Sequence, residues 1–167
     1  VEEAERLARD NGSRYDLAQA MFLRGHTNRV AGDLVAAEEA LEEAWQVSQA
    51  IADPNRMVVK ACLGLLYVER GRVGPARAEF RACLRSHVQQ AHIWAHLGML
   101  VAAADDPDDT LWAAHFEPLV QYLERGWSDP AIAQFGQLAA DRAERAGFEH
   151  RAVDAIHLAR AQQSLTS

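Results

Sequence analysis

The sequence repeats one pattern of small and bulky residues, and this pattern limits the folds that the chain can adopt. Gly64 is followed by Gly71, Ala76, Phe80 and Cys83, at offsets of 7, 12, 16 and 19 residues. The same four offsets recur in two other sets, which are Gly25, Gly32, Ala37, Leu41 and Ala44, and Ala140, Gly147, Ala152, Ile156 and Ala159. A half-match comes from Trp94, Leu97, Gly98 and Val101. Self-similarity of this kind is typical of helical repeat proteins.

Strand signals are nearly absent, whereas apolar residues at i, i+3 and i+4 fill almost the whole chain. The predicted helices are residues 1–9, 15–31, 33–52, 54–70, 72–86, 90–104, 107–125, 130–146 and 148–164. Three Asp-Pro pairs, at Asp53, Asp106 and Asp129, predict helix starts, because a carboxylate caps a helix and proline fits its first position. The glycines predicted to end helices are Gly12, Gly32, Gly71, Gly126 and Gly147. Since the connections are short, we expect antiparallel hairpins.

Small residues explain how two such helices can pack closely. Helix axes approach to about 8–10 Å only where the contact positions are small. We therefore predict that Gly64 meets Ala76 across one hairpin, with Tyr67 and Phe80 filling the space beside this contact.

In these residues the chain resembles the tetratricopeptide repeat family, whose signature is W-x₂-L-G-x₂-Y…A-x₃-F…P. The second unit carries most of the signature, as Leu63, Gly64, Tyr67, Gly71, Ala76 and Phe80. The late proline is missing from every unit, and only the third unit has the tryptophan, Trp94. Long helices of this kind are similar to the repeat arrays of large bacterial regulators, such as LuxR-type ATP-binding regulators and antibiotic-cluster regulators.

The resemblance implies an all-α fold, a right-handed superhelical solenoid of antiparallel helix hairpins with about nine helices. We expect one domain over residues 1–167 and divide it as follows: 1–14, the second helix of a truncated preceding repeat; 18–56, repeat 1; 57–90, repeat 2; 91–131, an irregular repeat 3; 132–167, repeat 4. Pro118 is expected to kink or break its helix. The chain begins in the middle of a helical pattern, which suggests a fragment of a longer protein.

The resemblance also implies a concave groove lined by the first helix of each repeat. The groove residues that it implies are Phe22, His26, Arg29, Val58, Ala61, Leu65, Val68, His92, Ala95 and Met99. The middle of this set is apolar and small, which suits an amphipathic helix or an extended apolar segment. We therefore predict a protein–protein interaction module of a bacterial, cytoplasmic regulator, whose groove binds a helix or peptide of a partner or of the parent protein.

Two other functions remain open. The array could enclose a small molecule and act as a sensing domain of a transcription or signalling regulator, with His26, Arg29 and His92 orienting the ligand. It could also act as a self-association or scaffold domain and form a homo-oligomer. Acidic chaperone tails are not expected ligands, because histidines and Phe22 stand where a cationic clamp would be needed.

The sequence carries no catalytic motif, so we do not expect an enzyme. His92 and His96 have an i, i+4 spacing that can hold a metal. No carboxylate or thiol lies near them and the H-E-x-x-H motif is absent, so no metal or cofactor is expected. The carboxylates of residues 105–109 are expected to cap a helix and to face solvent.

Charge and cysteine content restrict the partners and the compartment. The net charge of −7 argues against direct nucleic-acid binding and favours neutral or basic partners. Cys62 and Cys83 are expected to be buried, reduced thiols, which is typical of the cytoplasm. No apolar run reaches the ~18–20 residues that a membrane span needs.

Overall fold

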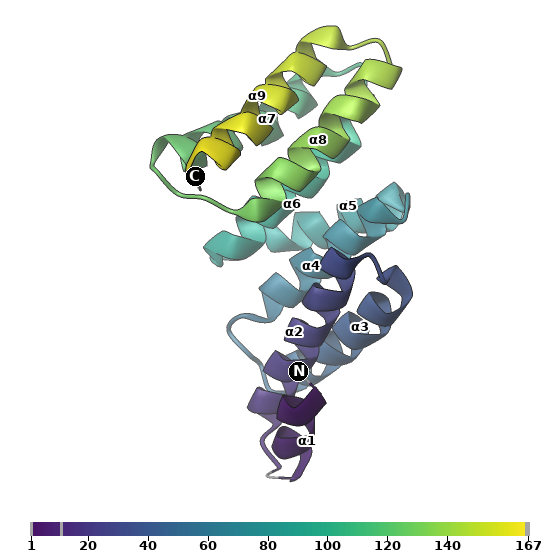
Figure 1. Ribbon diagram of the computed structural model, residues 1–167, viewed down its shortest axis with the longest axis vertical. Helices are drawn as coiled ribbons and strands as arrows, with labels where there is room; N and C mark the ends of the chain where they lie inside the picture. Colours follow the sequence, from purple (N-terminus) through teal and green to yellow (C-terminus); the bar gives the residue numbers. More distant parts are fainter. Residues whose placement is uncertain (1, 11, 166–167) are drawn as a thin grey trace. The chain divides into compact units, whose positions relative to one another are not determined.

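The computed structural model describes residues 2–10 and 12–165, which form helices joined by short connections (Figure 1). These residues contain nine helices and no strand. The helices are α1 (Glu2–Asp10), α2 (Arg14–Ala31), α3 (Leu34–Ala50), α4 (Arg56–Glu69), α5 (Val73–Cys83), α6 (Gln89–Ala103), α7 (Asp109–Glu124), α8 (Pro130–Arg145) and α9 (Glu149–Leu165). Every helix end lies within three residues of its predicted position, so the all-α prediction is confirmed.

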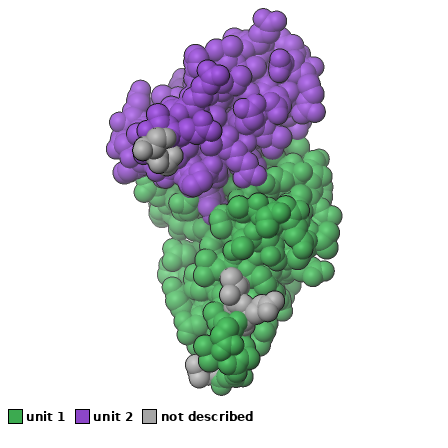
Figure 2. Space-filling model, viewed as in Figure 1, with its two compact units in different colours: residues 1–92 green, residues 93–167 purple. Residues whose placement is uncertain are grey.

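The chain divides into two compact units, residues 1–92 and 93–167 (Figure 2). In the first unit α2 pairs with α3 and α4 pairs with α5, while α1 packs on α2 and α4 packs on α3. In the second unit α8 and α9 form a hairpin, and α7 lies beside α9. The solenoid and its division into four repeats stay predictions.

Helix pairing in the first unit places a glycine against a large side chain. A Cβ atom on Gly64 of α4 would lie 2.4 Å from Cε1 of Phe80 on α5. A Cβ atom on Gly25 of α2 would lie 2.6 Å from Cγ of Leu41 on α3. Both pairs are 16 residues apart, so one contact recurs in two successive hairpins. The sequence predicts Ala76 opposite Gly64, but the ring of Phe80 occupies that place.

The hairpin of the second unit also has a glycine at its helix contact, but this glycine faces backbone and a small side chain. Gly136 of α8 faces α9, where a Cβ atom would meet the carbonyl oxygen of Ala155 and the Cβ of Ala159, both at 3.2 Å. The sequence pattern assigns the small contact position to Ala140, one turn later. Gly136 therefore lets α8 lie close to the backbone of α9 at Ala155.

The predicted helix ends are mostly confirmed. All five glycines named as helix ends have positive φ, and Gly32, at φ 86°, follows α2. Asp129 caps α8 as predicted. The assignments of Asp53 and Asp106 are wrong, because each accepts a hydrogen bond from the backbone N–H two residues later and so forms a turn before the helix begins. Helix α7 runs without a break through Pro118.

The buried side chain of Arg151 links three segments of the second unit by hydrogen bonds. Its side chain is fully buried, and its Nη1 donates to the carbonyl oxygens of Ala103, at 3.0 Å, and of Asp106. Its Nε donates to Oδ1 of Asp109 at 3.2 Å, and its guanidinium lies 4.3 Å from the ring centre of Phe148. One side chain of α9 thus holds the end of α6, the following turn and the start of α7.

A second buried network joins α6, α8 and α9. The indole Nε1 of Trp94 donates to Oδ2 of Asp129 at 2.9 Å. The backbone N–H of Asp129 donates to Oε1 of Gln162 at 2.8 Å, and its Oδ1 accepts from the N–H of Ala131. The carboxylate that caps α8 is therefore also the hydrogen-bond partner of a buried tryptophan.

Candidate binding surfaces

The structure places the predicted groove residues on α2, α4 and α6, and half of them are buried. The buried residues are Arg29, Ala61, Leu65, Val68 and Ala95. The half-buried residues are Phe22, His26, Val58, His92 and Met99. Ala95 and Met99 belong to the second unit, and the other eight belong to the first. Only the half-buried side chains present a surface that a partner can reach.

Arg29 has an internal role. Its side chain is 3% exposed, and its Nη1 donates to both carboxylate oxygens of Glu69, at 3.0 and 3.1 Å. Nearby, Nδ1 of His26 lies 3.8 Å from Sγ of Cys62. These contacts join α2 to α4, so Arg29 positions the two helices against each other.

Both cysteines are free and buried, as predicted. Burial raises the pKa of Cys62 to about 12, although the positive charge of Arg29 opposes this shift. Burial likewise raises the pKa of Cys83 to about 12, and its thiol donates to the carbonyl oxygen of Met57. A thiol with such a pKa is almost entirely protonated at neutral pH and is a poor nucleophile or metal ligand.

The two histidines of α6 have different partners. Nε2 of His92 donates to the carbonyl oxygen of Ser86. Nδ1 of His96 lies 3.2 Å from Nδ1 of His115 on α7, so one of these two nitrogens donates and the other accepts. Burial lowers the pKa of His115. Within the described part of the chain, no three His, Cys, Asp or Glu side chains are grouped so that they could hold a metal ion.

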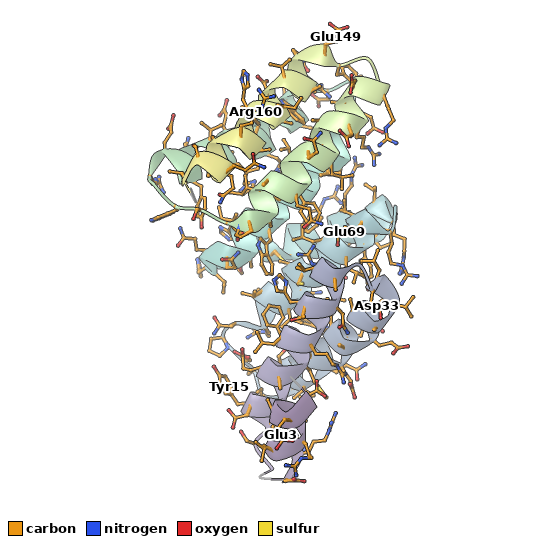
Figure 3. The ribbon with its side chains drawn as sticks, in the orientation of Figure 1. Glu3, Tyr15, Asp33, Glu69, Glu149 and Arg160 are labelled. Carbon is orange, nitrogen blue, oxygen red and sulfur yellow. The ribbon has the colours of Figure 1, made fainter. Side chains whose placement is uncertain are left out.

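An apolar row runs along α2 on the face next to the predicted groove residues. Tyr15, Leu23 and Val30 are 50%, 52% and 64% exposed, and their spacings of eight and seven residues place them on one side of the helix. Tyr15, near the start of α2, is labelled in Figure 3. We call these three residues the α2 stripe. The rings of Phe22 and His26 stack beside it, with centroids 6.0 Å apart. The three residues recur in the sequence at helical spacing, but the groove that the resemblance implies lies on the neighbouring face of α2.

The second unit contains an apolar groove between α7 and α9, with a volume of about 350 Å³. Leu123 and Leu158 form its buried floor, and Phe116, Val120 and Leu165 form its walls. We call this the α7–α9 groove. It was not predicted, because α7 and α9 are the second helices of their expected repeats and the resemblance assigns binding to the first helices.

None of the described helices is both long and apolar enough to cross a membrane.

A scan against protein-family models found no match. Searches of curated proteins and of solved structures also found no match. The function of this chain must therefore be inferred from its own surfaces and contacts.

Proposed function

We propose that the chain is a protein-interaction module whose first unit binds a helix or an extended peptide of a partner along α2. The observation that carries this proposal is the α2 stripe, in which three large apolar side chains on one helix face are each at least half exposed. Single exposed apolar residues are common on folded proteins, whereas a row of them on one face favours a contact surface.

The dimensions of the stripe suit a helical partner. From Tyr15 to Val30 the stripe covers 15 residue steps, which is about 22 Å of helix. A partner helix of about four turns would cover this length and would bury the exposed carbon atoms of Leu23 and Val30. The stacked rings of Phe22 and His26 add a flat edge to the same surface.

We further propose that the hairpins are tetratricopeptide-type repeats of a right-handed superhelical array. The recurrence of one glycine-to-large-residue contact, Gly25 with Leu41 and Gly64 with Phe80, supports a repeated hairpin unit. The placement of this module in a cytoplasmic bacterial regulator is supported by the sequence resemblance and by two buried free thiols.

The small-molecule alternative has less support. Two of the three polar residues that would orient such a ligand are engaged inside the unit, Arg29 with Glu69 and His92 with Ser86. The exposed side chains of the α2 stripe are apolar. A small-molecule pocket usually has several polar groups that point at the ligand, whereas an apolar patch of this kind is typical of a protein contact.

Site-specific photo-crosslinking in the native cells tests the proposal. A benzoylphenylalanine residue would replace Leu23 or Val30 in separate variants, and would replace Glu39, which is exposed on α3, as the control. We expect a crosslinked product with another polypeptide from the two stripe positions and not from Glu39. The product should disappear when a second change, Leu23→Glu, is introduced into the Val30 variant.

Two results would contradict the proposal. Equal crosslinking from Glu39 would show that the stripe is not a specific surface. Crosslinks only between copies of this chain, together with a mass that rises with concentration in light scattering, would instead support the self-association alternative.

A further inference from the structure

The α7–α9 groove has the length of two helical turns on each of its walls. On α7 it extends from Phe116 to Glu124, and on α9 from His157 to Leu165, which is eight residue steps in both cases. Eight steps correspond to about 12 Å. The i, i+4 and i+7 side chains of a bound helix span nearly the same distance, so the groove matches one apolar stripe of a short helix.

The composition of the groove also suits apolar anchors. Leu123 and Leu158 are buried at its floor, while Phe116 and Val120 are half-buried in its wall. Leu165 is 46% exposed at its end. Large side chains from a partner would therefore contact carbon on the floor and on both walls.

One edge of the groove carries negative charge. Glu124 lines the groove, and Glu117 lies seven residues earlier on α7, which places it along the same edge. Among the described residues, neither of these two carboxylates forms an ion pair within the protein, and the chain as a whole has a net charge of −7.

We infer that the α7–α9 groove binds an amphipathic helix of another protein, whose apolar stripe is flanked by lysine or arginine residues seven positions apart. The apolar stripe fills the space above Leu123 and Leu158. The basic side chains lie over Glu117 and Glu124, whose spacing they match. This site is independent of the α2 stripe, because its residues belong to the second unit.

The test uses a fluorescent 18-residue peptide and the full chain. The peptide carries leucines at i, i+4, i+7 and i+11 and lysines beside them at a spacing of seven; a matched peptide has glutamates in place of the lysines. We expect saturable binding of the lysine peptide by fluorescence anisotropy. The glutamate peptide should bind at least ~10-fold more weakly at low salt, because two like-charged contacts replace two attractive ones.

Two single variants locate the site. Leu165→Glu should weaken binding of the lysine peptide at least ~10-fold, because it introduces a charge at an apolar anchor. Val153→Glu is the control: Val153 is also on α9 and is 50% exposed, but it does not line the groove. It should change the dissociation constant by less than about 2-fold. Both positions are exposed, so both variants should fold, which circular dichroism would check.

The double variant Glu117→Gln/Glu124→Gln tests the charged edge. It should weaken binding of the lysine peptide by about 3- to 10-fold and should reduce the discrimination between the two peptides. Equal affinity of Leu165→Glu and the unmodified chain for the lysine peptide would overturn the proposal. A dimer that Leu165→Glu converts to a monomer in light scattering would also overturn it, because a second copy would then be the occupant.

Discussion

The aromatic ring of Phe80 fills the space beside the α-carbon of Gly64. Three ring atoms would lie 2.4 to 2.9 Å from a Cβ atom at this position, which is too close for any side chain. Gly64 lies in the interior of α4, where glycine costs about 1 kcal/mol relative to alanine. The close approach of α4 to α5 therefore depends on a residue that weakens the helix by itself.

Gly64→Ala should destabilise the protein in spite of the better helix propensity of alanine. The added methyl group must displace the Phe80 ring, and overpacking of this kind costs about 1–3 kcal/mol. Urea unfolding followed by circular dichroism measures the change. Gly74→Ala is the control, because Gly74 is also helical but has nothing within 4 Å of its Cβ position. It should be neutral or slightly stabilising, and equal stability of the two variants would contradict the packing argument.

Helix positions could be predicted because their signals are local. The apolar spacing and the glycines act within a few residues, and Gly32 and Gly147 end their helices as expected. The partner of Gly64 could not be predicted, because Ala76 and Phe80 lie one turn apart on the same face of α5, and the offset of the two helices along their axes decides which one meets Gly64. An aspartate before proline is similarly ambiguous, since Asp106 can cap a helix or form the turn before it.

The candidate surfaces were harder to predict because burial depends on packing between helices. Leu23 and Leu65 are both leucines on first helices of expected repeats, yet Leu23 is exposed and Leu65 is fully buried. Arg29 has the sequence context of a groove cation, but a distant residue, Glu69, pairs with it inside the unit. Neither fact follows from spacing along the chain alone.

Arg151→Met should strongly destabilise the second unit. The change leaves the carbonyl oxygens of Ala103, Ala104 and Asp106 without their buried donor, and each lost hydrogen bond costs about 1 kcal/mol, or about 3 kcal/mol in total. Asp109→Asn should cost much less, because Asp109 is largely exposed and the carbonyl contacts of Arg151 persist. Urea unfolding of the two variants should therefore rank them in this order, and a similar loss from both would contradict it.

Cys62 and Cys83 should resist thiol reagents while the protein is folded. With a pKa of about 12, only about one thiol in ten thousand is ionised at pH 8, and both side chains are buried. Ellman's reagent should therefore detect almost no thiol in buffer within minutes, and two thiols per chain in 8 M urea. Rapid reaction of one thiol in buffer would show that its helix opens or that its surroundings are more polar.

The His115 side chain should make the second unit less stable in mild acid. Burial holds its pKa below the ordinary value of 6.5, and its Nδ1 faces Nδ1 of His96 at 3.2 Å. Above pH 6.5 both the folded and the unfolded state carry a neutral imidazole, so the stability contributed by this group is fully present. Below pH 6.5 the unfolded state binds a proton that the folded state resists, and the free energy of unfolding falls.

Replacement of this imidazole separates its effect from those of the other titrating groups. His115→Gln should flatten the decline of the unfolding free energy between pH 7 and pH 5, because glutamine does not titrate. His157→Gln, at an exposed position of α9, is the matched control. Urea unfolding at half-unit pH steps measures both slopes. If the two variants show the same slope as the unmodified chain, His115 is protonated as readily in the folded state as in the unfolded one, and the His96–His115 pair does not control the acid stability of this unit.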